Sequence, residues 1–381
     1  MKRVLFVSNL RKSDDSMTST DIMTLNIIKG ISGCGVQLDL FILYDDEKEV
    51  KPLKSFYAKF CQKMFYAKRL LHEGQSKYKS IFLSLFLQMF KNHYFREIKK
   101  TQIKSPYDVI ICNKITIDEI IFGKILKKNT NSRLLYEYWS DPMALSGINS
   151  EIFKKMPRKW AFRLIEKRAI KNCDKIIYGT KILYLTQKEF YKKEASRMAY
   201  IDIAYCESKS DKSDSYNANS IIYAGNYYST IRNINELIKA ISSQNKYTLD
   251  IFGNSDLKFE NTHNITFHGR VSKNELDFIK NNYSTEVCIL NKNTPQIPGK
   301  IFYDMMSKKT IIILADGPMQ NEIIEYLSRY KRFLVCKNRD DDILELLSSN
   351  LIVDYIPDYS FLEKYFSPMT ISKSLIDGGM N

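Results

Sequence analysis

The fold of this chain is decided by the stretch 287–314, VCILNKNTPQIPGKIFYDMMSKKTIIIL. Its two outer runs, Val287–Leu290 and Ile311–Leu314, are short, apolar and rich in β-branched residues, which is typical of buried parallel strands. The segment between them is then expected to be a crossover helix that begins at Pro298, because proline is tolerated in the first helical turn. Gly299 lets a ligand approach the backbone, and Lys300 adds a cation where the helix dipole is already positive. This pattern indicates a diphosphate site; the alternative is an ordinary helix start with an exposed lysine.

A second element upstream is also suited to phosphate. Ser220–Ala224 reads as a strand that ends at Gly225-Asn226, and an amphipathic helix, 233–241, is expected directly after Arg232. Ligands of doubly wound sheets bind at the carboxyl ends of the strands. We therefore expect Arg232 and Lys300 to converge on one anion, with a solvated Arg232 as the alternative.

The order of elements from Ser220 to Leu314 resembles the donor half of a GT-B glycosyltransferase of the retaining family 4 type. In that family a Gly-Arg loop followed by a Lys-Gly pair holds the donor diphosphate, and the matching residues here are Gly225-Asn226 and Arg232-Asn233. The run 247–253 resembles the family's strand that ends in glycine. The run 265–271 resembles its base-contacting loop, which implies donor contacts from Arg270 and Val271.

The run Pro298-Gly299-Lys300-Ile301-Phe302 resembles the Pro-Ser-Lys-Leu-Phe-Glu-Tyr signature of the same family. The resemblance implies that Pro298, Gly299 and Ile301 also line the donor site. Two positions depart from the family pattern: Asn226 replaces the first arginine, and Tyr303 stands where a glutamate is expected to hold the ribose hydroxyls. Either the helix shifts slightly to present Asp304 to the ribose, or ribose recognition differs.

The first half resembles the family more weakly. A strand at 2–8, a helix at 21–31 and a strand at 36–43 are expected, and the intervening loop carries the hydroxyls of Ser16 and Thr18 in place of the usual glycine pair. The run 134–142 resembles the acidic-Leu-Trp-Pro segment of transferases that act on lipid-linked sugars. Glu137 and Asp141 are candidates to orient the acceptor or the donor sugar; the alternative is that they cap a strand end beside a buried Trp139.

The length of 381 residues fits two domains. We expect an acceptor-binding domain at 1–205, a polar linker at 206–219, a nucleotide-sugar-binding domain at 220–358 and a C-terminal helical segment at 359–381 that returns to the first domain. The expected fold class is α/β, with two Rossmann-like doubly wound domains facing across a cleft, as in GT-B enzymes.

The net charge of +15 is distributed unevenly along the chain. Residues 1–200 hold 38 Lys and Arg against 20 Asp and Glu, whereas residues 201–381 hold 20 against 23. Within 51–105 there are 13 basic and two acidic residues, interleaved with aromatic ones. This composition favours helices that lie on an anionic membrane surface; the alternative is a solvated basic face over an aromatic core. No motif indicates nucleic-acid binding, and none is expected.

The cysteines, the histidines and the apolar runs limit where the protein can be located and which chemistry it can perform. The seven cysteines are scattered without a CxxC pair, and the four histidines form no ligand-spaced cluster, so neither a protein-bound metal nor a cofactor is expected. The first residues lack a signal-peptide core, and the longest apolar run, 81–90, is about half a membrane span. A cytoplasmic protein that is peripheral to the inner face of the cell membrane is expected.

The resemblance, taken with these features, implies a metal-independent, retaining transfer of a sugar from a nucleotide-sugar donor to a glycan acceptor, linked to polyprenyl diphosphate, in bacterial surface polysaccharide synthesis. Arg232 and Lys300 are the expected catalytic cations, because the reaction requires neutralisation of the leaving diphosphate. The alternatives are a phosphorylase or nucleotide-sugar epimerase of the same architecture, and a catalytically weakened paralogue that only binds a partner. A dinucleotide-binding oxidoreductase is disfavoured, since no strand is followed by GxGxxG.

Overall fold

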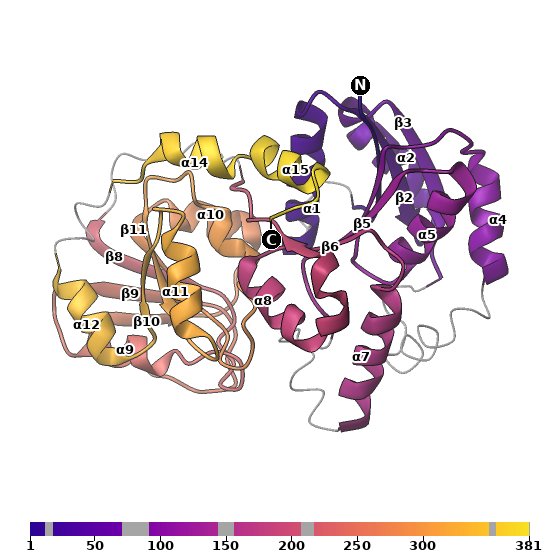
Figure 1. Ribbon diagram of the computed structural model, residues 1–381. Coiled ribbons are helices and arrows are strands. Elements are labelled where there is room, and N and C mark those ends of the chain that lie inside the picture. Colours follow the sequence, from indigo (N-terminus) through magenta and orange to yellow (C-terminus); the bar gives the residue numbers. More distant parts are fainter. Residues whose placement is uncertain (12–17, 71–90, 144–155, 207–216, 350–355, 381) are drawn as a thin grey trace. The chain divides into compact units, whose positions relative to one another are not determined.

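The computed structural model describes residues 1–11, 18–70, 91–143, 156–206, 217–349 and 356–380 (Figure 1). These residues form two compact units. Unit 1 contains Met1–Ala204 and Ser367–Asn381, and unit 2 contains Tyr205–Phe366. The segment expected to form the C-terminal return, 359–381, is thus divided between the two units at Ser367.

Unit 1 is built on a seven-stranded sheet with the order β3-β2-β1-β4-β5-β6-β7, in which every neighbouring pair is parallel. The strands predicted at 2–8 and 36–43 are present, displaced by one residue. The strands are β1 (Arg3–Asn9), β2 (Gln37–Tyr44), β3 (Lys63–Lys68), β4 (Val109–Asn113), β5 (Leu134–Trp139), β6 (Lys175–Tyr178) and β7 (Met198–Tyr200).

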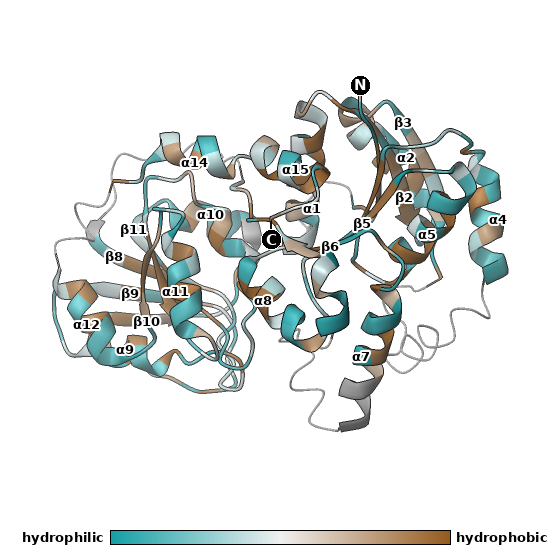
Figure 2. Ribbon diagram, in the orientation of Figure 1, coloured by the Kyte–Doolittle hydropathy of each residue, from teal (hydrophilic) through white to brown (hydrophobic). Residues whose placement is uncertain are grey.

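Helices cover this sheet, and its strands carry the apolar core, as the brown strands of Figure 2 show. α5 packs on β1, β4 and β5, and α4 packs beside it on β3. The elements between the strands are α1 (Ser19–Gly33), η1 (Glu47–Glu49), α2 (Val50–Tyr57), η2 (Ala58–Phe60), α4 (Lys91–Thr101), α5 (Asp118–Thr130), α7 (Met156–Ala169), α8 (Lys181–Phe190) and η4 (Lys192–Arg197); α15 (Pro368–Ile376) completes the unit.

The C-terminal helix α15 packs against α1, far away in the sequence (Figure 1). The Ser372 hydroxyl donates to the Ile27 carbonyl at 3.0 Å, and a side chain at Gly30 would overlap the Pro368 carbonyl. The close approach of the two helices therefore requires glycine at position 30.

The basic segment 51–105 was expected to form helices, and this expectation is only partly correct. α2 and α4 are helical, but Lys63–Lys68 is the edge strand β3, and 71–90 lies outside the described residues. Tyr57 is buried and donates to the Arg11 carbonyl at 2.8 Å, so part of the aromatic content belongs to the core. Sheet pairing with β2 overrides the helical pattern, because local propensity is a weak prior against tertiary contacts.

Unit 2 contains a six-stranded sheet with the order β10-β9-β8-β11-β12-β13, again with every pair parallel. The runs Val287–Leu290 and Ile311–Leu314 fall, to within one residue, on β11 and β12, which pair with each other, and the prediction that both are buried parallel strands is confirmed. β8 begins at Asn217, inside the stretch expected to be linker, and 207–216 is not described. The strands are β8 (Asn217–Ala224), β9 (Thr248–Phe252), β10 (Ile265–His268), β11 (Tyr283–Ile289), β12 (Thr310–Ala315) and β13 (Leu334–Lys337).

The helix expected to cross from β11 to β12 is absent, and this expectation is wrong. A single 3-10 turn, η5 (Gly299–Phe302), stands in its place after Pro298. A four-residue turn has no macrodipole of the kind the sequence argument assumed. The remaining helices of unit 2 are α9 (Asn235–Ser242), α10 (Lys273–Lys280), α11 (Gln320–Ser328), α12 (Asp340–Ser348) and α14 (Tyr359–Phe366).

Candidate functional site

Two glycines at the carboxyl ends of β8 and β9 form the floor of the candidate site. Gly225 follows β8 with a φ of 153°, and Gly253 follows β9 with a φ of 148°. A Cβ atom on Gly253 would overlap the Gly225 carbonyl. Both positions therefore favour glycine for the backbone angle, and Gly253 also requires it for the close approach of the two strand ends.

Lys300 and Arg232 converge above Gly225, although they are 68 positions apart in the numbering. A Cβ atom on Gly225 would lie 2.8 Å from Lys300 Nζ and 3.4 Å from Arg232 Nη1. Lys300 Nζ donates to the Ala224 carbonyl at 2.7 Å, and Arg232 Nη1 donates to the Asn226 carbonyl at 2.8 Å. The structure thus brings two cations together over a glycine at the end of a buried strand.

The two cations of the site are close together and largely removed from solvent. Burial lowers the pKa of Lys300 and the neighbouring Arg232 lowers it further, while Cys288 and Glu286 act in the opposite direction. Lys300 Nζ also lies 5.4 Å from the centre of the Tyr223 ring, a cation–π contact. Arg232 Nε is buried with no hydrogen-bond partner among the described residues. An anion at Gly225 would relieve the repulsion between the two cations.

The first departure from the family pattern, Asn226, has a structural role. Its Oδ1 accepts from the Asn254 backbone amide at 3.1 Å, which ties the loop after β8 to the loop after β9. No cation stands at this position. The site therefore relies on Arg232 and Lys300 without a third basic residue from position 226.

The remaining donor candidates of unit 2 lie either after β10 or at η5. Arg270 and Val271 follow β10, whose carboxyl end lies at the same sheet edge as those of β8 and β9, and Arg270 is exposed. Pro298 precedes η5, Gly299 begins it and Ile301 is buried within it. None of the described contacts joins Arg270 or Val271 to the two cations.

Asp304 and Tyr303, the ribose candidates, follow η5 directly. Asp304 Oδ2 lies 2.5 Å from Lys280 Nζ, which also lies 2.7 Å from Glu286 Oε2. Burial acts to raise the pKa of Asp304, but Lys280 outweighs it and holds the pKa below its usual range. Asp304 is thus already part of a partly buried ion triad, and contact with a ribose would require it to share its oxygens with Lys280.

The unit 1 candidates that the structure describes, Glu137, Asp141 and Thr18, each have a partner within unit 1. Glu137 is fully buried, 3.4 Å from Lys124 Nζ and 3.3 Å from the Trp139 indole nitrogen that donates to it. Burial raises the pKa of Glu137 to about 7, against the opposing effect of Lys124. Glu137 lies within β5 beside the buried Trp139 and does not cap the end of the strand, so neither reading of the sequence describes its ion pair with Lys124. The carbonyl of Asp141 accepts from Lys114 Nζ at 2.9 Å.

The hydroxyl candidates before α1 have a local explanation where they are described. Thr18 caps α1: its Oγ1 accepts from the Asp21 amide at 3.3 Å, while Asp21 Oδ2 accepts from the Thr18 amide at 2.8 Å. This reciprocal pair is a capping box. Ser16 lies outside the described residues.

Several residues around the site were missed by sequence reasoning: Tyr223, Lys280, Glu286 and Arg332. Glu286 interrupts an apolar strand, which is a detectable signal of a buried pair. Arg332 lies in a basic surface-like run, and nothing in that run distinguishes it. Within the described ranges, no three His, Cys, Asp or Glu side chains lie close enough to hold a metal ion, and no helix is long and apolar enough to cross a membrane.

No protein-family model and no curated protein matches the sequence. The fold, in contrast, is matched by solved structures over nearly the whole of both chains.

One of these structures is a point mutant of S. aureus TarM, solved with fondaparinux, alpha-GlcNAc-glycerol and UDP. It matches with a TM-score of 0.57 at 12% identity, and the match covers 99% of each chain. Anabaena HepE, solved with UDP and glucose, matches with a TM-score of 0.55 at 12% identity and the same coverage. WaaG, a glycosyltransferase involved in lipopolysaccharide biosynthesis, matches with a TM-score of 0.53 at 9% identity, covering 99% of this chain and all of WaaG.

The two doubly wound parallel sheets and these full-length matches define the class: the chain has the GT-B fold of the glycosyltransferases it resembles. The fold class expected from the sequence is confirmed. At 9–12% identity the likeness concerns the fold, so activity has to be argued from the residues of this chain.

Proposed function

We propose that this protein is a glycosyltransferase that takes its sugar from a nucleotide-sugar donor whose diphosphate binds at Gly225, Arg232 and Lys300. The observation that carries the proposal is the convergence of the two cations over Gly225. Ligands bind at the carboxyl ends of strands in such sheets. HepE and TarM, which share the fold, were each solved with UDP.

The chemistry follows from this placement. As the bond between the sugar carbon and the diphosphate oxygen breaks, negative charge develops on the leaving diphosphate, and the fixed cations of Arg232 and Lys300 stabilise it. The acceptor hydroxyl attacks the same sugar carbon, and its proton passes to the leaving phosphate oxygen. This retaining, metal-independent route requires no separate general base. The amides near Gly299 assist, and Arg270, Val271, Tyr303 and Asp304 are the candidates for the base and the ribose.

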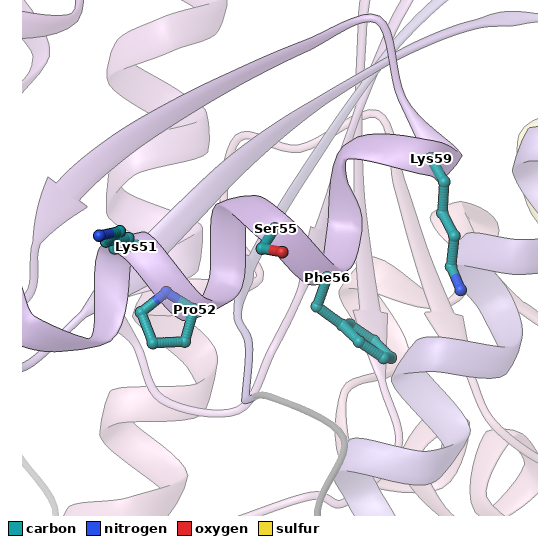
Figure 3. Close-up of a pocket in the computed structure, with 5 residues that line it drawn as sticks. All are labelled: Lys51, Pro52, Ser55, Phe56 and Lys59. Carbon is teal, nitrogen blue, oxygen red and sulfur yellow. The ribbon is translucent and has the colours of Figure 1, made fainter.

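The acceptor is proposed to be a glycan carried on polyprenyl diphosphate at the cytoplasmic face of the membrane, within surface polysaccharide synthesis. The support is the basic excess of residues 1–200. Figure 3 shows part of this surface: Lys51, Pro52, Ser55 and Phe56 of α2, with Lys59 of η2, line an open hollow. Lysines beside an aromatic ring suit an interface with anionic headgroups.

A thermal-shift screen of nucleotide sugars tests the donor proposal. UDP-, GDP-, ADP- and dTDP-sugars carry a diphosphate, whereas CMP-sugars carry one phosphate and serve as the matched control. A donor at about 100 times its dissociation constant stabilises the protein by roughly 2.7 kcal/mol. We expect a clear shift with at least one diphosphate donor and a much smaller one with CMP-sugars. Equal shifts with both kinds, or none with any at millimolar concentration, would contradict the proposal.

A further inference from the structure

The loop that follows Lys300 is held by a fully buried arginine of a later segment. Arg332 precedes β13 and has no exposed surface. Its Nε donates to the Met305 carbonyl at 2.6 Å. Its Nη2 lies within hydrogen-bond distance of three more carbonyls, those of Asp304 at 3.3 Å, Ser307 at 3.1 Å and Lys309 at 2.8 Å. One guanidinium thus gathers four carbonyls of the segment 304–309.

This arrangement explains why the expected crossover helix does not form. In an α-helix each carbonyl accepts from the amide four residues later. The carbonyls of 304, 305, 307 and 309 accept from Arg332, and that of Asp304 also accepts from the Ser307 amide, three residues later, at 3.0 Å, so this stretch does not continue η5 as an α-helix. The dependence is mutual, because burying a guanidinium is costly and these carbonyls supply acceptors for its Nε and Nη2.

Contacts from other residues, two of them close to Arg332 in the sequence, also hold the segment 302–309. Phe302 packs against Tyr330 and Phe333, with ring centres 5.4 and 6.1 Å apart. The Tyr359 hydroxyl donates to the Ser307 carbonyl at 2.8 Å. Lys280 holds the side chain of Asp304. The chain from 302 to 309 is therefore fixed at several points, and Lys300 lies immediately before it.

We propose that Arg332 is a positioning residue of the anion site: by fixing the carbonyls of 304–309 it sets the place from which Lys300 reaches Gly225. This inference rests on the proposed function, because the anion at Gly225 is the donor diphosphate. Lysine has a flexible side chain whose ordering opposes binding, so a fixed backbone beneath it favours affinity. Arg332 touches no ligand and acts only through Lys300. Lysine replaces it only in part, because one ammonium lacks the planar fork that spans separate carbonyls.

Two measurements on Arg332→Met and Arg332→Lys test this inference, with Lys331→Met as the control because it removes an exposed cation from the adjacent position. The first is calorimetric titration with UDP, well below the unfolding temperature of each variant. We expect at least tenfold weaker binding by Arg332→Met, an intermediate loss for Arg332→Lys and no change for Lys331→Met. In a Lys300→Ala background Arg332→Met should cause little further loss. Losses that multiply in the double variant would show that Arg332 acts independently of Lys300 and would overturn the inference.

The second measurement needs no nucleotide. Competitive acetylation followed by mass spectrometry reports the reactivity of the Lys300 amine, which we expect to change in Arg332→Met and not in Lys331→Met. Unchanged Lys300 reactivity in a folded Arg332 variant would overturn the inference whatever UDP does. If the wild type fails to bind UDP while Lys300 reactivity still responds to Arg332, the proposed function fails and the positioning role stands. If Arg332→Met does not fold, Arg332→Lys supplies both readouts.

Discussion

Gly225 is the residue of the site where a side chain would come up against both cations. In Gly225→Ala the new Cβ would lie 2.8 Å from Lys300 Nζ, at a φ of 153° that residues with side chains rarely adopt. The flexible lysine end is the part that can move, so we expect the ammonium to be displaced and UDP binding to weaken about tenfold or more, as measured by calorimetry.

Gly35→Ala is the matched control for that substitution. Gly35 also has a positive φ, 68°, but a Cβ there would have no atom within 4 Å. It lies in unit 1, so its substitution also places a side chain at a positive φ, at a lower backbone cost, without touching the site. Equal UDP affinities for Gly225→Ala, Gly35→Ala and the wild type would show that the space above Gly225 is not used.

The charge state of Lys300 makes a prediction about pH. Burial and Arg232 lower the pKa of Lys300 below its usual value near 10.5, and only the protonated amine attracts a diphosphate. UDP affinity should therefore begin to fall as pH rises through the alkaline range, before free lysine titrates. Lys300→Arg should retain its affinity there, because arginine stays charged. A wild-type affinity that stays flat up to pH 10.5 would contradict this role for Lys300.

At the scale of elements, β5 and α5 share a buried ion pair whose effect on stability depends on pH. Glu137 on β5 is held by Lys124 of α5, and burial raises the pKa of Glu137 to about 7 from 4.5. A raised carboxyl pKa means that the folded state binds the proton more tightly than the unfolded state does. The free energy of unfolding therefore falls as pH rises from about 4.5 to 7.

Glu137→Gln removes this titration. Relative to the wild type, its free energy of unfolding should improve by on the order of 3 kcal/mol between about pH 4 and pH 8, measured by urea unfolding. Some pH dependence will remain, because burial also raises the pKa of Glu119 to about 7. Parallel pH profiles for Glu137→Gln and the wild type would show that Glu137 is not strained by burial.

The elements differ in how far the sequence could predict them. The strands β11 and β12 were predictable because their apolar runs carry the signal themselves. The absence of a helix beyond η5 was not predictable, because the carbonyls of the segment that follows η5 accept from Arg332, which lies 28 positions later in the sequence than Asp304. β3 was missed for a similar reason: its strand pairing with β2 is a tertiary contact that its own basic and aromatic pattern does not reveal.

In the candidate site, too, the residues marked by a local sequence pattern could be predicted and those that depend on tertiary contacts could not. Gly225, Arg232 and Lys300 could be proposed because strand order predicts that the carboxyl ends of parallel strands gather at one edge. The interior position of Glu137 and the ion triad of Asp304 could not, because both depend on lysines, Lys124 and Lys280, contributed by separate helices.

At the scale of the whole molecule, the uneven charge leads to a prediction about membranes. Residues 51–105 carry 13 Lys and Arg, and each near an anionic surface contributes on the order of 1 kcal/mol. Replacing both Lys51 and Lys59, which line the hollow of Figure 3, by Gln should weaken co-sedimentation with anionic vesicles by roughly ten- to thirtyfold. Rising salt should weaken wild-type binding as well.

The control for that experiment removes two exposed lysines of unit 2, Lys246 and Lys258, in the same way. This variant should bind vesicles as the wild type does. If both double variants lose binding equally, attraction follows total charge and not the surface of α2. Equal wild-type binding to neutral and anionic vesicles would remove the support for a membrane-borne acceptor.

The central claim is that Arg232 and Lys300 together bind the donor diphosphate, and calorimetric titration of UDP into the wild type, Arg232→Ala and Lys300→Ala tests it most directly. Hydrogen bonds from charged groups typically contribute about 1.5–3 kcal/mol, or roughly ten- to a hundredfold in affinity. The account predicts that the wild type binds UDP and that each substitution weakens binding by about that factor while the protein stays folded. Wild-type affinity in both folded variants would contradict it.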